Sequence, residues 1–150
     1  MMKTSKKGGY RLCSLLFETT DNYSANLQTL LDLISKTSEK SIIVAPEVCL
    51  TGFDYENYDK ALEFSLEANE KIKSVSKDKI IILTMLEKRE GKVFNFTKIF
   101  FNGEIIYERA KAKLFRFGDE HKYMLEGSSD AVNIVEIAVS YTHLTLPTKR

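Results

Sequence analysis

Apolar residues in the first third of the chain follow two spacings, that of a strand and that of a helix. Residues 10–17 form an apolar run of strand length, and residues 42–44 form a β-branched run typical of a buried strand. Between them the apolar residues have helical spacing, and Asp21 or Asn22 can cap this helix. The apolar stripe of the predicted helix comprises Leu27, Leu30, Leu31 and Ile34. The order strand, helix, strand predicts a parallel β-α-β unit.

A second helix is predicted over residues 58–76, where one face is largely apolar and Glu and Lys fill the other. Its inward face comprises Leu62, Ser65, Leu66, Asn69, Ile72 and Val75. The charged residues of this stretch are expected to form a solvated surface.

From Ile80 onward the pattern is that of strands joined by tight turns. Glu90-Gly91 is typical of a turn, and Asn102-Gly103 is a strong hairpin signal because both central positions of a type I′ turn need a positive φ. The predicted strands are residues 80–86, 93–101, 103–115 and 131–137. The residues around the phenylalanines at 94, 96, 100 and 101 are not enriched in Arg or Lys, so these rings are expected to pack in the core and not to stack on nucleic-acid bases.

Composition excludes several classes of protein. The 150 residues are 43% hydrophobic and 29% charged, as expected of one globular domain. Lys plus Arg number 22 against 21 Asp plus Glu, which gives no electrostatic reason to expect a nucleic acid or a membrane as partner. No apolar run approaches the roughly 20 residues that span a bilayer, so a cytoplasmic protein is expected. Cys13 and Cys49 do not make a disulfide framework.

The candidate chemistry begins at Glu47. The apolar run 42–44 stops at Pro46, which has no N–H to donate, and the next residue is a carboxylate at the expected carboxyl end of a strand. Ligands of open α/β sheets gather at this edge. From the residues alone, Glu47 is either a loop carboxylate that caps a helix or a reactive group.

Three segments resemble one family of enzymes. PEVCLTGFDY, which contains Glu47, resembles the PE-x-x-x-x-G-[YF] signature of the carbon-nitrogen hydrolases, the nitrilase-like amidases. AKAKLF is similar to the strand end that carries the catalytic lysine of that family and aligns Lys111 with it, and GDEHKYMLEG resembles the segment with an accessory glutamate, here Glu120. The chain departs from the family pattern at Ala110, Lys113 and Met124, which leaves the walls of the substrate site open.

This resemblance implies an α/β fold, the N-terminal portion of a nitrilase-like four-layer α-β-β-α sandwich. It implies a catalytic set of Glu47, Lys111 and Glu120 with no cofactor and no metal. The implied partner is a small-molecule amide, carbamoyl compound or nitrile, and the full-length protein is expected to form homo-oligomers. In such a site a thiolate attacks the substrate, Glu47 is the general base, Lys111 stabilises the oxyanion, and Glu120 orients the lysine or the substrate. The resemblance gives no role to Cys49.

The nucleophilic cysteine of the family lies on a later strand, which this sequence does not reach. Residues 139–150, VSYTHLTLPTKR, are similar to a translated sequencing-library adapter, so we expect residues 1–138 to be the native N-terminal portion and the remainder a non-native tail. His143 therefore receives no catalytic role. The chain by itself is expected to be inactive.

Two alternatives remain open. A catalytically silent relative could use the same site to bind a small carboxamide. An unrelated α/β interaction domain would hold Glu47 and Lys111 far apart, whereas a carbon-nitrogen hydrolase would bring their side chains together.

Overall fold

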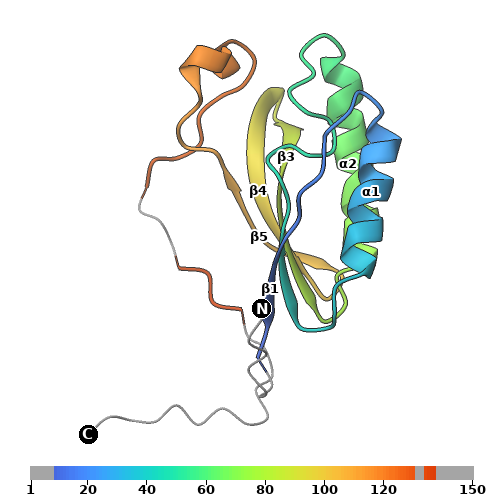
Figure 1. The fold of residues 1–150 in the computed structure, drawn as a ribbon. Helices are drawn as coiled ribbons and strands as arrows, with labels where there is room; N and C mark the ends of the chain where they lie inside the picture. The colour runs from blue at the N-terminus through green and yellow to red at the C-terminus, as the bar shows by residue number, and fades with distance from the viewer. Residues whose placement is uncertain (1–8, 131–133, 138–150) are drawn as a thin grey trace, which may run out of the picture.

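A five-stranded sheet with two helices on one face makes up the fold (Figure 1). The computed structural model describes residues 9–130 and 134–137. The strands are β1 (Arg11–Ser14), β2 (Ser41–Val44), β3 (Lys79–Arg89), β4 (Lys92–Phe101) and β5 (Glu104–Ala110); the α-helices are α1 (Tyr23–Ser35) and α2 (Tyr58–Ser74); and two short 3-10 helices follow, η1 (Arg116–Gly118) and η2 (Glu120–Lys122). Within the described part of the chain, neither α-helix is long and apolar enough to cross a membrane.

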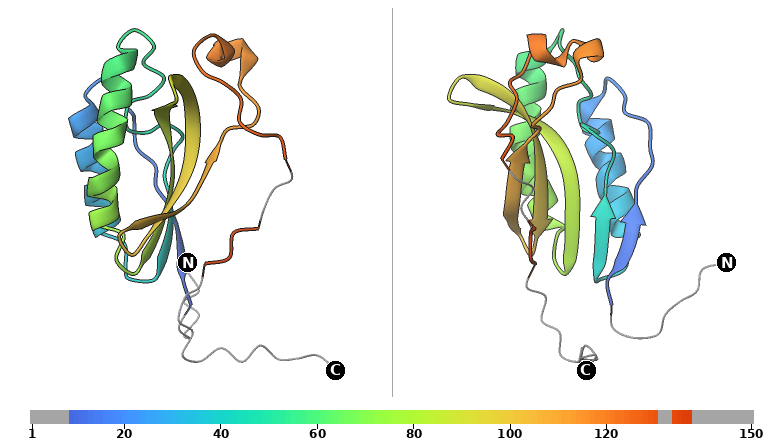
Figure 2. Two further views of the ribbon diagram at one scale, coloured as in Figure 1. Left: turned by 180° about the vertical axis from the view of Figure 1, so that it is seen from behind. Right: turned by 90° about the vertical axis from the view of Figure 1, so that its left-hand side faces the viewer.

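The strands lie in sequence order across the sheet, β1-β2-β3-β4-β5. β1, β2 and β3 are parallel to one another, while β4 is antiparallel to both β3 and β5. The predicted parallel β-α-β unit is therefore confirmed. Because β5 reverses the direction of β4, it runs the same way as β2, and the carboxyl ends of both strands lie at one end of the sheet. The loop after β2 and the segment after β5 meet there (Figures 1 and 2).

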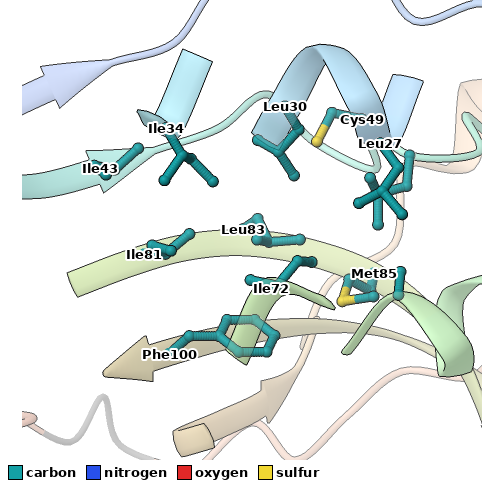
Figure 3. Packing of buried hydrophobic residues seen from close by; sticks show 12 residues of the cluster. Leu27, Leu30, Ile34, Ile43, Cys49, Ile72, Ile81, Leu83, Met85 and Phe100 are labelled. Atoms are coloured by element: carbon teal, nitrogen blue, oxygen red, sulfur yellow. The ribbon is translucent and has the colours of Figure 1, made fainter. Parts of the chain in front are cut away.

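The main hydrophobic core lies between the helices and the sheet (Figure 3). Leu30 and Ile34 of α1 and Ile72 of α2 are fully buried, and they face alternate side chains of β2 and β3 such as Ile43 and Ile81. Fully burying a side chain of this size stabilises the fold by about 1.5–3 kcal/mol. The predicted stripe of α1 is thus confirmed, and it fixes which face of the sheet the helices cover.

Local signals place the turns and the helix start. Asn22 caps α1, since its side-chain oxygen accepts a hydrogen bond from the Ala25 N–H at 3.0 Å. At the β4–β5 turn, Asn102 and Gly103 have φ of 48° and 83°, as the predicted type I′ hairpin requires.

The opposite face of the sheet carries exposed apolar residues on β1 and β2. Leu12 and Val44 lie at positions that alternate with the helix-facing ones, and they are 72% and 38% exposed. The described residues thus form one helix layer and one sheet layer of the predicted four-layer sandwich. The second sheet is not among them.

Four details of the sequence prediction were wrong. The first strand covers only Arg11–Ser14, and β5 ends at Ala110 instead of continuing to residue 115. Leu66 of α2 is 61% exposed, because it lies beside the covered stripe and not within it. Residues 134–137 are not a strand, since they pair with no neighbour, and residues 131–133 of that predicted strand lie outside the described residues. The predicted tail at 139–150 also lies outside them.

Candidate active site

Glu47 lies just past the carboxyl end of β2, in a turn that its neighbours fix. Val48 has a φ of 46°, a left-handed conformation that β-branched residues rarely adopt. The Val48 N–H donates a hydrogen bond to Thr84 Oγ1 on β3 at 2.7 Å, and the Val48 side chain is buried. The hydrogen bond to Thr84 and the burial of the Val48 side chain therefore hold the strained turn in place. The Glu47 side chain, which is 49% exposed, extends from this fixed backbone.

Lys111 follows directly after β5, and its ammonium group reaches Glu47. Lys111 Nζ donates hydrogen bonds to Glu47 Oε1 at 2.8 Å and to Glu120 Oε1 at 3.1 Å. The Lys111 N–H also donates to the Asn95 carbonyl at 2.7 Å, which extends the pairing of the sheet by one residue. The predicted convergence of Glu47 and Lys111 is confirmed, although 64 residues separate them in the chain.

Glu120 is the buried member of this cluster. It lies on η2 with 4% of its surface exposed, and its second carboxylate oxygen, Oε2, accepts the Phe115 N–H at 2.8 Å. A buried carboxylate needs such partners, because an unpaired charge away from water is costly. Glu120 therefore ties the loop after β5 to the lysine.

The charges of the cluster favour the cationic form of Lys111. Partial burial lowers the pKa of Lys111, but the hydrogen bonds and negative charges of Glu47 and Glu120 outweigh burial and raise it above its ordinary value. The cluster of two carboxylates and one ammonium therefore offers a fixed positive charge and, at Glu47, a partly exposed base. Within the described residues, no group of three or more His, Cys, Asp and Glu side chains could hold a metal ion.

Asn95 also belongs to this cluster, and the sequence prediction missed it. It is 99% buried near the start of β4, and its Nδ2 donates to Glu47 Oε1 at 3.0 Å. The sequence feature that could have indicated Asn95 is a polar residue at an inward position of a strand, between Phe94 and Phe96.

A cluster of aromatic rings lies near the carboxylates of Glu47 and Glu120. The Tyr55 ring stacks on Tyr123 with centroids 3.7 Å apart, and Tyr58 donates a hydrogen bond to the Tyr123 carbonyl. Burial, and after it the negative charge of Glu120, raise the pKa of Tyr55 to about 12. The buried Tyr55 hydroxyl has no hydrogen-bond partner among the described residues.

Cys49 does not join the cluster, although it is two residues from Glu47. Its side chain is fully buried in the helix-side core with Leu50 and Leu30, and burial raises the pKa of its thiol to about 12. A thiol in such surroundings is inert as a nucleophile.

The sequence is similar to that of an amidase. It is 33% identical over 113 residues to the 2-oxoglutaramate amidase of Bacillus subtilis (strain 168), and the match covers 71% of this chain and 44% of that protein. No sequence model of a known family matches the chain.

Solved structures share the fold of the described residues. A CN-hydrolase superfamily protein from Xanthomonas campestris matches 82% of the chain and 44% of its own, with a TM-score of 0.57 and 20% identity. The predicted resemblance to the carbon-nitrogen hydrolase family is thereby confirmed. Among other hydrolases of this fold, a double mutant of the amidase from Nesterenkonia sp. AN1, in complex with acrylamide, matches 85% of the chain and 52% of its own, with a TM-score of 0.73 and 14% identity.

The same fold occurs in a larger enzyme. The glutamine-dependent NAD+ synthetase from Acinetobacter baumannii matches 86% of the chain and 26% of its own, with a TM-score of 0.73 and 18% identity. The present chain therefore spans less than half the length of its curated relative and about a quarter to a half of these structures. The α/β sandwich that the sequence predicted is the fold of this family.

Proposed function

We propose that this chain supplies the general base and the oxyanion-stabilising lysine of an enzyme that hydrolyses a non-peptide carbon-nitrogen bond in a small amide, carbamoyl compound or nitrile. The observation that carries the proposal is the placement of Lys111 Nζ between Glu47 and Glu120, at 2.8 and 3.1 Å. The three residues come from the three segments that resemble the family's catalytic segments. The sequence similarity to an amidase supports the proposed hydrolysis of a carbon-nitrogen bond.

For an amide substrate the reaction has two halves. Glu47 takes the proton of a cysteine thiol, and the thiolate attacks the amide carbon, so that the carbonyl oxygen becomes an oxyanion beside Lys111. When the carbon-nitrogen bond breaks, the departing nitrogen takes the proton from Glu47, and ammonia or an amine leaves behind a thioester. Glu47 then deprotonates water for attack on the thioester, and the released thiolate recovers a proton.

The geometry fits these roles. Lys111 is held as a cation by two carboxylates and is still 27% exposed, so one of its N–H groups can face a substrate oxygen. Glu120 uses both oxygens within the protein and is buried, which suits a positioning role. Removing one donor to an oxyanion typically lowers the rate by about 10²- to 10³-fold.

The nucleophile is proposed to lie beyond Ile137. Cys13 and Cys49 are the two cysteines of the sequence, and neither is bonded to Glu47, Lys111 or Glu120 in the described residues. We propose accordingly that residues 1–138 are the N-terminal portion of the hydrolase domain and that residues 139–150 are a non-native tail. Sequencing the gene in source DNA tests this: we expect a Cys codon about 10 to 25 residues after Ile137 and not the twelve codons of 139–150.

Of these substrate classes, we propose to test a small carboxamide first. The curated relative is a 2-oxoglutaramate amidase, which makes a carboxamide that also carries a carboxylate the first compound to assay. Without the cysteine, the 150-residue chain should release no ammonia, because catalytic groups that act as a unit lose nearly all activity when one is missing.

The test is ammonia release from 2-oxoglutaramate and from simple amides by the complete protein. Glu47→Gln keeps the shape of the side chain and removes the base, so turnover should fall by about 10²-fold or more. Glu63→Gln, at an exposed carboxylate of α2, is the matched control and should retain the wild-type rate. Undiminished turnover in Glu47→Gln would exclude Glu47 as the base. Tight amide binding without turnover in the wild type would instead indicate a silent binding module.

A further inference from the structure

Asn95 is joined to both of the residues proposed to carry the reaction. Its side-chain Nδ2 donates to Glu47 Oε1 at 3.0 Å, and its main-chain carbonyl accepts the Lys111 N–H at 2.7 Å. One residue of β4 therefore fixes the carboxylate that follows β2 and the backbone that follows β5.

An asparagine at position 95 is unfavourable for the stability of the fold. It is 99% buried and pairs across the sheet with Leu86, which packs in an apolar cluster with Val48 and Leu114. Asn95 Oδ1 is buried and has no hydrogen-bond partner among the described residues. A buried acceptor without a partner typically costs about 1–3 kcal/mol, which an aliphatic side chain would avoid. Among the described residues, the hydrogen bond to Glu47 is the one polar contact of this side chain that offsets the cost.

The two donors to Glu47 meet on a single oxygen. Asn95 Nδ2 and Lys111 Nζ both bond to Oε1, and no described residue donates a hydrogen bond to Oε2. An oxygen that accepts two hydrogen bonds, one of them from a cation, is the less basic of the pair. The carboxylate is thus oriented with Oε2 free.

We propose that Asn95 is a positioning residue that, together with Lys111, fixes the Glu47 carboxylate so that Oε2 is the atom that exchanges protons with the nucleophile and the leaving group. The inference rests on the proposed role of Glu47 as the base. It assigns Asn95 no contact with the substrate.

Substitutions in the complete protein test this role by kinetics. Asn95→Leu removes the hydrogen-bond donor together with the unpaired oxygen, so the unfolding midpoint should be retained. We expect kcat to fall about 10- to 100-fold while KM changes by less than about 3-fold. This loss in kcat is part of the roughly 10²- to 10⁴-fold rate enhancement that a general base contributes. Asn95→Asp places a second carboxylate against Glu47, and the acidic limb of the kcat/KM profile should move up by about one pH unit. Thr97→Val, two residues along the same face of β4, is the matched control and should change neither quantity.

A second measurement needs no substitution of Asn95. The side-chain amide resonances of Asn95 should follow the titration of Glu47 in the NMR spectrum of the complete protein, and Glu47→Gln should abolish that inflection. The proposal is overturned if these resonances do not respond to pH, or if the folded variants keep the wild-type kcat and pH profile. If the protein hydrolyses no amide but the Asn95 signals still follow Glu47, the proposed reaction is wrong while the contact inferred here stands.

Discussion

Lys111 is bonded to two carboxylates that depend on it to different extents. The Glu47 side chain is 49% exposed and can be solvated by water, whereas the Glu120 side chain is 6% exposed and relies on its protein partners. Removing the ammonium group would leave the Glu120 carboxylate with the Phe115 N–H as its only hydrogen-bond donor among the described residues. The lysine therefore contributes to stability chiefly through Glu120 and to the proposed chemistry through Glu47.

Replacing Lys111 by Met should lower the free energy of unfolding by about 1–3 kcal/mol, because a buried carboxylate loses a charged hydrogen-bond partner. Lys113→Met, two residues away at an exposed position, should stay within about 0.5 kcal/mol of the wild type. Urea denaturation at pH 7 measures both. Equal midpoints for the two variants would mean that the Lys111–Glu120 contact is not formed in solution.

The segment that follows β5 is the element that brings Glu120 to the site. The Leu125 N–H donates to the Val93 carbonyl at 2.9 Å, and the Gly127 N–H donates to the Lys111 carbonyl at 2.8 Å. A side chain at Gly127 would meet the sheet directly, since a Cβ there would lie 2.5 Å from the Ala110 carbonyl oxygen. The absence of a side chain allows this segment to lie against the end of β5.

Gly127→Ala should therefore loosen the segment without unfolding the sheet. Overpacking of this kind typically costs about 1–3 kcal/mol, so hydrogen exchange at the Leu125 and residue 127 amides should accelerate by about tenfold or more. Exchange in the core of β3 should not change. Glu126→Ala, at the exposed neighbouring position, serves as the control, and identical exchange in the two variants would show that the close approach to Ala110 is not present in solution.

At the scale of elements, the sequence predicted most of what the structure contains. The helix stripes and the Asn102-Gly103 hairpin could be predicted because each depends on residues close together in the chain. The end of β5 could not, because it depends on a segment that comes later in the chain. The last β5 residue with a β4 partner is Ala110, opposite Phe96, although β4 begins at Lys92. Beyond that pair the edge of β4 is met by Leu125, whose N–H donates to the Val93 carbonyl. The predicted strand also failed over residues 134–137, the described part of that stretch, which has no neighbouring strand to pair with.

At the scale of the molecule, the site is a product of topology. Glu47 and Lys111 were predicted from motifs, and their meeting follows from two strands that end at the same end of the sheet. Asn95 could not be assigned in the same way, because its role depends on the side-chain contact with Glu47 across 48 residues of chain. Similarly, the burial of Cys49 could be expected from its place beside a buried strand, but its position in the helix-side core could not.

The buried acidic groups of the protein predict a loss of stability in alkali. Burial raises the pKa of Cys49, Tyr55 and Tyr58 to about 12 each, so the folded state retains protons that the unfolded state releases. Their contribution is fully present below the unfolded pKa values, about 8.5 for Cys and 10 for Tyr, and is lost as the pH rises toward 12.

The free energy of unfolding should consequently fall between pH 8.5 and 10, mainly through Cys49, and more steeply above pH 10. Cys49→Ala should flatten the first part of this fall while leaving the second. Denaturation series at pH 7, 8, 9, 10 and 11 give the slopes of both parts. An unchanged slope between pH 8.5 and 10 in Cys49→Ala would show that this thiol is not buried as described.

The central claim is that Glu47 and Lys111 serve a cysteine that lies outside the described residues. The most direct measurement is the mass of the covalent intermediate, obtained by acid quench of the complete protein during turnover of a small amide, followed by peptide mapping of the acylated cysteine. We predict a thioester on a cysteine beyond Ile137, unaffected by Cys13→Ala and Cys49→Ala and absent in Glu47→Gln. An acyl group on Cys49, or full turnover by a variant with no cysteine, would contradict the account.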